Sequence, residues 1–313
     1  MTTRRESLKL FGAATLGAVL PAACRTENRK NEATRFIYCL NTSTIRGQGQ
    51  GLEETIEIAA KAGYDGVELW VRDVQAYVDE GGSLATLGGL LESQGLTVEG
   101  AIAFPHWSVE DDDQRREGLI RMETEMNMMA ELGCTRIAAP PSGYSGSGMD
   151  FVAAGERFRK AIEIGRKTGV MPQLEFQGPS KSLFHLGQAL FIAVAADDPD
   201  ARILPDVYHM YKGGSGFNGL KMIDGKMVEL FHFNDYPGNI AREDMNDSHR
   251  VYPGDGIAPM QDVITDLYRM GGTKVLSLEL FNPQYWEQDA LQVASTGLQK
   301  MRTLVESSIR SLQ

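Results

Sequence analysis

The chain alternates short apolar segments with longer amphipathic segments over most of its length, and this order restricts its fold more than any other feature. Eight apolar segments have the length of strands, and each precedes a segment with helical spacing, which several times ends at a glycine. Parallel strands with crossover helices close into a barrel at eight strands, so the order predicts a single-domain (β/α)8 TIM barrel. The expected strands are 35–45, 64–70, 96–104, 135–140, 171–176, 201–207, 228–234 and 274–281. The expected helices are 51–62, 83–94, 112–132, 151–168, 180–196, 217–223 (the weakest), 259–270 and 287–312.

A doubly wound open sheet is the alternative architecture. Such a sheet usually carries a glycine-rich phosphate turn after its first strand, and residues 47–51 read Gly-Gln-Gly-Gln-Gly. No helix-opening spacing and no later ribose-binding acid accompany these glycines. We therefore favour the barrel.

Acidic residues and histidines stand at the carboxyl ends of the last four expected strands, where a (β/α)8 barrel places its active site. Glu175 ends the fifth strand, Asp206 ends the sixth with His209 three residues on, His232 lies in the seventh and Glu279 in the eighth. An unpaired carboxylate in an apolar strand costs on the order of several kcal/mol. A bound metal ion accounts for all of these groups, whereas an ion pair inside the barrel accounts more readily for one acid than for three. Three carboxylates with imidazole form an oxygen-rich site for one divalent ion, with Mn²⁺, Mg²⁺ or Co²⁺ favoured and Zn²⁺ as a further candidate.

Residues 35–313 resemble the xylose isomerase-like TIM barrel superfamily of sugar isomerases and epimerases over essentially the whole mature chain. The resemblance rests on the four strand ends, on the Asp-x-x-His pattern of Asp206 and His209, and on a segment that begins at Arg250. This segment, Arg-Val-Tyr-Pro-Gly-Asp-Gly, matches the family's Arg-x-x-x-Gly-x-Gly pattern. The resemblance implies that His209 contacts the substrate or a metal-bound oxygen rather than the ion, and that Arg250 reaches toward substrate hydroxyl groups. The metal ligands that it implies are Glu175, Asp206, His232 and Glu279.

The resemblance further implies an isomerase or epimerase of an unphosphorylated sugar or a related polyhydroxy carbonyl compound. Removal of a proton next to a carbonyl needs a base near the carbon and an electrophile at the carbonyl oxygen. Glu175 and Glu279, on opposite sides of the mouth, are the expected pair that removes and returns the proton through an enediolate intermediate. Phosphorylated sugars are not expected, because no Lys- or Arg-rich loop or helix-opening turn is present to hold a phosphate.

Three other functions are open to the same barrel. Loss of a β-substituent after proton abstraction would make the protein a lyase or hydrolase of 3-keto-glycosides, as in some relatives of this barrel. A DNA-repair endonuclease would need more metal ligands and a basic groove, which five histidines and a net charge of −11 do not favour. A non-catalytic sugar-binding protein would not need two opposed glutamates. We therefore expect a small sugar as the partner and no nucleic acid, and the sequence is compatible with a homo-oligomer.

Aromatic residues fall just beyond three of the expected strand ends, at Trp70, Trp107 and Trp286. Their flat faces would suit the C–H faces of a sugar at the barrel mouth, and packing under loops is the alternative. His106, beside Trp107, is a further candidate for substrate contact.

Four other polar residues have weaker support as site residues. Glu68 and Asn234 are further candidates at the rim of the mouth. His185 is expected to pack inside the helix at 180–196. His249 either orients the neighbouring arginine or is exposed.

The N-terminus is typical of a targeting segment and is left out of the barrel. The pair Arg4-Arg5 resembles a twin-arginine export signal, and a weakly apolar run follows at 10–23. The residues before Cys24 resemble a lipoprotein signal box, which would make Cys24 a lipid anchor, and cleavage without lipidation is the alternative. We therefore expect a signal peptide at 1–24, a polar tether at 25–34 and a periplasmic protein.

Two cysteines, Cys39 and Cys134, belong to the expected barrel and lie on its first and fourth strands. These strands are roughly opposite each other in an eight-stranded barrel, too far apart for a disulfide. We therefore expect two buried thiols.

Overall fold

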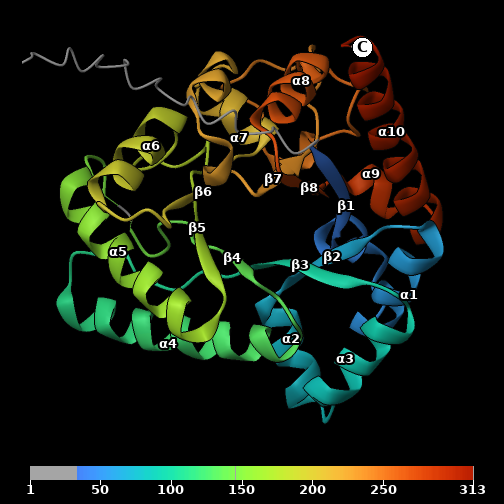
Figure 1. Cartoon of the computed structure of the whole chain (residues 1–313). Coiled ribbons are helices and arrows are strands. Elements are labelled where there is room, and N and C mark those ends of the chain that lie inside the picture. The colour runs from blue at the N-terminus through green and yellow to red at the C-terminus, as the bar shows by residue number, and fades with distance from the viewer. Residues whose placement is uncertain (1–33, 145, 313) are drawn as a thin grey trace, which may run out of the picture. The chain divides into compact units, whose positions relative to one another are not determined.

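Eight parallel strands follow one another around a barrel, and the connecting helices lie on its outside (Figure 1). The computed structural model describes residues 34–144 and 146–312. Neighbouring strands are hydrogen-bonded in the order β6-β5-β4-β3-β2-β1-β8-β7, and an isolated parallel bridge between Asp206 and His232 joins the two ends of this order. The predicted single-domain (β/α)8 barrel is confirmed. The strands are β1 (Arg35–Asn41), β2 (Gly66–Trp70), β3 (Thr97–Ile102), β4 (Arg136–Ala138), β5 (Met171–Glu175), β6 (Arg202–Leu204), β7 (Leu230–Phe233) and β8 (Thr273–Leu278).

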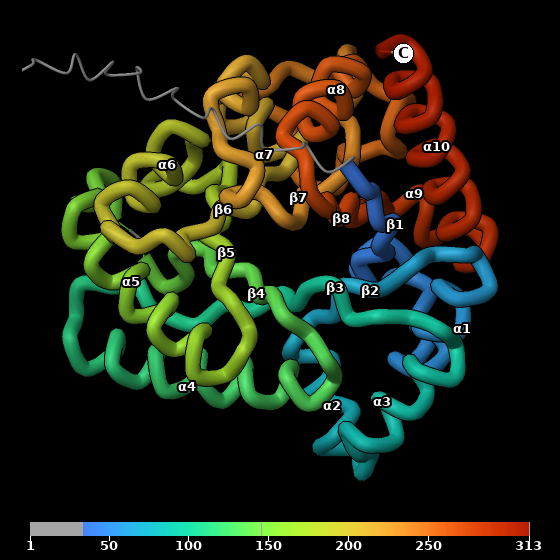
Figure 2. The backbone as a smooth tube through the Cα atoms, in the orientation of Figure 1, coloured from blue at the N-terminus to red at the C-terminus, as the bar shows by residue number. Residues whose placement is uncertain are grey.

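The long helices surround the ring of strands, as the backbone tube shows (Figure 2). Helices α1 and α5 end at Gly63 (φ 92°) and Gly169 (φ 80°), left-handed positions that glycine adopts without steric cost. The α-helices are α1 (Leu52–Ala62), α2 (Val71–Asp79), α3 (Leu84–Ser93), α4 (Asp112–Glu131), α5 (Phe151–Thr168), α6 (Leu186–Ala195), α7 (Val207–Lys212), α8 (Met260–Met270), α9 (Pro283–Trp286) and α10 (Ala290–Arg310). The 3-10 helices are η1 (Thr42–Gln48), η2 (Asn218–Met222), η3 (Gly225–Met227) and η4 (Asp247–His249).

Several boundaries differ from those expected, and capping explains two of them. The sixth strand ends at Leu204, because the Asp206 side chain accepts a hydrogen bond from the His209 N–H at 2.8 Å and thereby begins α7. The expected helix at 180–196 begins only at Leu186. His185 is its N-cap and accepts a hydrogen bond from the Gly187 N–H at 2.9 Å, so it does not pack inside the helix. The weak helix expected at 217–223 is the short η2.

Apolar side chains fill the barrel interior and the layer between strands and helices. Cys39 belongs to the interior cluster and Cys134 to the outer one, and both are free and buried. The expected buried thiols are thus confirmed. Among the described helices, none combines the length and the apolar character needed to cross a bilayer.

A group of ion pairs, which we call the amino-end cluster, lies near the amino ends of β3, β4, β6 and β7 and consists of Glu99, Arg136, Arg202 and Glu229. Arg136 Nη1 lies 3.0 Å from Glu99 Oε2, and Arg136 Nε lies 3.2 Å from Glu229 Oε2. Arg202 Nε lies 3.2 Å from Glu229 Oε1. Two guanidinium groups thus balance two carboxylates at this end of the barrel.

The predicted signal peptide at 1–24, with its twin arginine and Cys24, lies outside the described residues. So does the predicted tether, except for residue 34. Export and lipidation stay predictions.

Candidate metal centre

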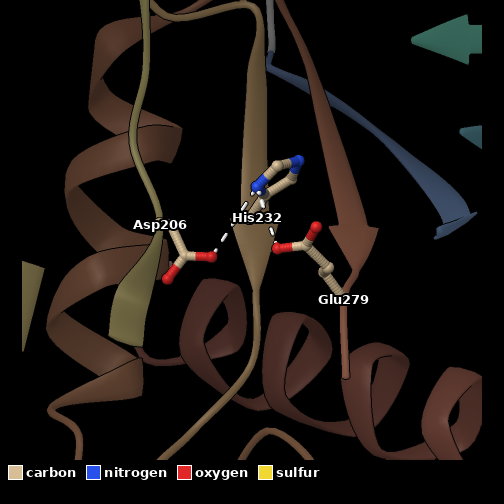
Figure 3. Close-up of side chains that lie close together, drawn as sticks. All are labelled: Asp206, His232 and Glu279. Atoms are coloured by element: carbon tan, nitrogen blue, oxygen red, sulfur yellow. Dashed lines mark ion pairs between the residues drawn. The ribbon is translucent and has the colours of Figure 1, made fainter. Parts of the chain in front are cut away.

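The four residues expected to bind a metal come together at the carboxyl ends of the last four strands. His232 Nδ1 lies 3.2 Å from Glu279 Oε2, 3.5 Å from Glu175 Oε1 and 3.6 Å from Asp206 Oδ2. All four side chains are at most 6% exposed. Figure 3 shows the Asp206 and Glu279 carboxylates pointing at the His232 ring from neighbouring elements. We call these four residues the mouth cluster.

Local structure at the strand ends brings these side chains to one place. Glu175 is the last residue of β5, and His232 lies inside β7. Asp206 is the N-cap of α7, and Glu279 directly follows β8. Because parallel strands in a closed barrel direct their carboxyl ends to the same mouth, four side chains far apart in the sequence meet there.

Behind the histidine, a buried carboxylate fixes the orientation of the ring. His232 Nε2 lies 3.1 Å from Glu68 Oε2. Glu68 also accepts hydrogen bonds from Ser277 Oγ at 2.7 Å and from Asn41 Nδ2 at 2.8 Å. When Nε2 donates its proton to Glu68, the Nδ1 lone pair can bind a metal ion, as in metal-binding histidines. Glu68, expected at the rim, is thus a buried support for the histidine.

The donor set fits a divalent cation. His232 Nδ1 is fully buried and has no hydrogen-bond partner among the described residues, although three carboxylates surround it. Such an orphaned nitrogen is rare in a folded protein, and a cation among these oxygens would give it a partner. Asp206, His232 and Glu279 can offer ligand atoms that all lie within 4.8 Å of one another, and a Glu175 oxygen beside them is a fourth candidate ligand atom.

The proton affinities of these groups reflect the crowding of negative charge. Burial alone would lower the pKa of His232, but the Glu279 and Glu68 carboxylates raise it well above its ordinary value. Burial raises the pKa of Glu279 to about 8. The negative charges of Asp206 and Glu175 also act to raise this pKa, whereas His232 and Arg250 act to lower it. Without a metal, ion pairs with Arg250 and protons held by the site offset this repulsion, and a divalent ion would offset it further.

Arg250 and His209, expected on the substrate side, both border the mouth cluster. Arg250 is 1% exposed, and its Nη1 donates to Asp206 Oδ2 at 2.8 Å and to Glu279 Oε2 at 2.7 Å. His209 Nδ1 accepts a hydrogen bond from the Gly178 N–H at 3.2 Å. Burial lowers the pKa of His209, and its Nε2 lies 3.4 Å from Arg250 Nη2.

The glycines that follow Arg250 hold its loop through one carboxylate. Asp235, just after β7, accepts hydrogen bonds from the N–H groups of Gly254 at 3.0 Å, Gly256 at 3.1 Å and Ala258 at 2.9 Å. A Cβ atom at Gly256 would lie 2.3 Å from Asp235 Oδ1, so only glycine fits there. The Gly-x-Gly pattern therefore has a structural role in placing the loop that carries Arg250.

A cavity of about 600 Å³ opens above the mouth cluster. Its polar lining includes Glu175, His209, Arg250 and Glu279, and its aromatic lining includes Trp70, Phe104, Phe281 and Trp286. Two of the three predicted tryptophans are therefore at the mouth, beside the groups that can do chemistry.

The third tryptophan and its neighbouring histidine are not in this cavity. Trp107 is fully buried, donates its indole N–H to Pro140 O at 2.8 Å and packs against Phe158. His106 is exposed and lies beside Gly143. The loop after β3 turns the indole into the core, so we correct the expectation of substrate contact for Trp107 and find no cavity contact for His106.

Other polar residues support the site from behind. Asn234 donates to Asp206 Oδ2 at 3.1 Å, and the His249 Nδ1 atom accepts from the Asn246 N–H at 3.1 Å as part of a local cap. Three further residues of the site were not predicted: Asn41 and Ser277, which hold Glu68, and Asp247, which pairs with Arg250. A usable signal existed for Asn41, because it is the polar residue that ends the first apolar strand.

Comparison with known proteins gives a consistent set of relatives. A family model described as Xylose isomerase-like TIM barrel matches residues 56–304, which include the whole mouth cluster. The chain is 24% identical over 274 residues to an inosose isomerase of Bacillus velezensis, with 85% of this chain and 96% of that protein covered. It is 24% identical over 265 residues to a 3-dehydroshikimate dehydratase of Pseudomonas putida, with 82% of this chain and 40% of that protein covered. A crystal structure of the IolI protein with a zinc atom has a TM-score of 0.80 at 22% identity, with 87% of this chain and 99% of that chain covered.

Proposed function

Because the chain belongs to the xylose isomerase-like TIM barrel family, we propose that it is a divalent-metal-dependent isomerase or epimerase of an unphosphorylated sugar or a related polyhydroxy carbonyl compound. The observation that carries this proposal is the orphaned His232 Nδ1 facing three buried carboxylates below an aromatic-walled cavity. The inosose isomerase among the relatives supports the reaction type.

Two carboxylates in the mouth cluster are placed to move a proton. Glu175 and Glu279 both line the cavity, and they approach it from β5 and from the end of β8. One carboxylate removes the proton from the carbon next to the carbonyl, and the other returns a proton to the same or the neighbouring carbon. Whether isomer or epimer forms depends on which carbon and which face receives it.

Two donors stand where negative charge develops on the substrate oxygens. Arg250 lines the cavity with its guanidinium group, and His209, whose Nδ1 accepts from the Gly178 N–H, lines it beside the arginine and can donate from Nε2. Hydrogen bonds from such fixed donors strengthen as the substrate oxygen becomes anionic. A bound divalent ion would add positive charge at the same oxygens and so lower the barrier further.

The choice of metal follows from the ligand chemistry. Three carboxylates and one imidazole favour Mn²⁺, Mg²⁺ or Co²⁺. Zn²⁺ is also supported, because the IolI structure contains a zinc atom.

A lyase or hydrolase of 3-keto-glycosides is the second candidate. The 3-dehydroshikimate dehydratase among the relatives favours it, since a dehydratase eliminates a group from its substrate. The same proton abstraction next to a ketone would then be followed by loss of a β-substituent.

One experiment separates these reactions. The metal-loaded protein is incubated in D2O with free ketoses and, separately, with 3-keto-glycosides, and the products are followed by NMR. Deuterium incorporation with epimer or isomer formation supports the first proposal, and release of the aglycone supports the second. No deuterium uptake and no product with any substrate would remove both.

Export of the protein is a separate proposal that rests on the N-terminal sequence alone. The twin-arginine pair and the apolar run before Cys24 support a periplasmic enzyme, with or without a lipid anchor. Cell fractionation with an Arg4-Arg5 to Lys-Lys variant tests it, because the variant should stay in the cytoplasm if the twin arginines act as the signal.

A further inference from the structure

A second cavity lies at the same end of the barrel, and the proposed proton transfer does not use it. Its volume is about 680 Å³, compared with about 600 Å³ for the cavity above the mouth cluster. Its walls come from η1, which follows β1, from the first turn of α1, and from α2, which follows β2. Both cavities therefore belong to the carboxyl-end face of the barrel, where substrates of this fold bind.

One layer of side chains separates the two cavities. The Arg46 guanidinium, which lines the second cavity, lies 4.1 Å from the ring centroid of Trp70, which lines the first. The Arg72 guanidinium, also in the second cavity, lies 4.5 Å from the same ring. Only the thickness of one side chain therefore separates a ligand in the first cavity from the second cavity.

Polar groups of the second cavity lack partners within the described part of the chain. Thr42 is only 4% exposed, and its hydroxyl has no hydrogen-bond partner. The Gln50 Oε1 atom is likewise buried without a donor. Gly51 is the N-cap of α1 and makes no side-chain cap, so the first turn of that helix faces the cavity uncapped. Because buried polar groups are nearly always hydrogen-bonded, a ligand rich in hydroxyl groups would complete this site.

The charges around the second cavity select an uncharged ligand. Two guanidinium groups and four carboxylates line this cavity. One of these guanidinium groups is already paired, because Arg46 Nη2 lies 3.0 Å from Asp73 Oδ2. The surplus of carboxylates opposes a phosphate or another anion. The lining contains both hydrogen-bond donors and acceptors as well as the ring of Tyr77, which suit the hydroxyl groups and C–H face of a sugar ring.

We propose that the second cavity binds a further sugar unit, and that the substrate is a disaccharide or a longer saccharide whose reacting unit lies over the mouth cluster. This inference rests on the proposed function and narrows its substrate class. The unit in the second cavity contributes binding energy without taking part in the proton transfer.

A glycine at the cavity wall offers a way to fill the site. Gly51 has φ −69°, and a Cβ atom there would meet nothing within 4 Å, so Gly51→Phe introduces a ring without backbone strain. Thr42→Val removes one hydroxyl at nearly constant volume. Gly89→Phe in α3 is the matched control, because a Cβ at this exposed glycine also meets nothing within 4 Å.

Calorimetric titration of the wild type and these variants with glucose, maltose, cellobiose and trehalose tests the inference. We expect at least one disaccharide to bind about tenfold more tightly than glucose, the gain expected from a few net hydrogen bonds. Gly51→Phe should abolish that preference, Thr42→Val should reduce it, and Gly89→Phe should keep it. Disaccharides that bind no more tightly than glucose, or a preference that survives in Gly51→Phe, would overturn the inference.

Turnover distinguishes a failure of this inference from a failure of the proposed function. If Gly51→Phe converts a monosaccharide at the wild-type rate while no disaccharide preference exists, the second cavity is not a subsite and the enzyme proposal stands. If disaccharides bind as expected but no sugar exchanges a proton in D2O, the proposed function fails and the binding site stands.

Discussion

The barrel carries a group of charged side chains at each end, partly exposed at the amino end and buried at the mouth, and the two groups are built differently. In the amino-end cluster, each carboxylate has a guanidinium partner at 3.0 to 3.2 Å, and positive and negative charges are equal in number. At the mouth, the carboxylates of Glu68, Glu175, Asp206 and Glu279 surround the His232 imidazole, and Arg250 pairs with two of them. One nitrogen of that imidazole has no hydrogen-bond partner among the described residues.

This difference separates a structural cluster from a ligand site. A balanced set of ion pairs satisfies itself and needs no further group, so it contributes to stability alone. A surplus of carboxylates around an orphaned nitrogen is costly unless a cation joins it. The contrast agrees with the general division of such barrels, in which chemistry lies at the carboxyl-end face and the opposite face stabilises the fold.

The largest effect should come from removing one carboxylate at the mouth. Glu279→Gln should lower kcat by about 10³-fold, because an amide cannot accept the substrate proton, while the remaining ligands keep part of the metal bound. The measurement is steady-state turnover with metal content determined on the same samples. The matched control is Glu229→Gln in the amino-end cluster, and a Glu279→Gln enzyme with full activity would contradict the assigned role.

A smaller effect is expected from the carboxylate behind the histidine. Glu68→Gln removes the charge that holds the Nε2 proton of His232, so the affinity for Co²⁺ or Mn²⁺ should fall about 10- to 100-fold. Calorimetric titration of the metal-free protein with either ion measures this affinity. Glu99→Gln provides the same chemical change at the other end of the barrel, and equal affinities for both variants would show that Glu68 does not support the ligand.

The smallest effect should come from the amino-end cluster itself. Glu229→Gln removes one partner from two partly exposed ion pairs and should cost about 1 kcal/mol, or about 2 °C in Tm. Its turnover and metal content should equal those of the wild type. Thermal unfolding, the activity assay and a determination of metal content check these expectations. A loss of bound metal in this variant would contradict the distinction between a structural cluster at the amino end and a ligand site at the mouth.

The sequence predicted the mouth cluster well because acids and a histidine stand out against apolar strands. Glu175 and Glu279 close two such strands, and parallel strand order alone brings them to one mouth. The start of α7 was missed, because Asp206 was taken as the end of a strand although an Asp can also cap a helix.

Loop residues were predicted less well, for a physical reason. Trp70 is the last residue of β2 and lines the cavity. Trp107 lies in the loop after β3, and its position in the sequence does not fix which way that loop turns, so its burial in the core was not predicted. The partners of Glu68 were missed for a related reason, since Asn41 and Ser277 are single polar residues whose pairing depends on strand register.

The most direct test of the account is the amount of metal that the mouth cluster holds. Protein stripped with a chelator, reloaded with Mn²⁺ and desalted should retain about one ion per chain in the wild type and in Glu229→Gln. His232→Ala and Asp206→Asn should retain almost none, with circular dichroism confirming that both remain folded. A wild type without bound metal, or folded His232→Ala and Asp206→Asn proteins that retain as much metal as the wild type, would contradict the assignment of the mouth cluster as a metal centre.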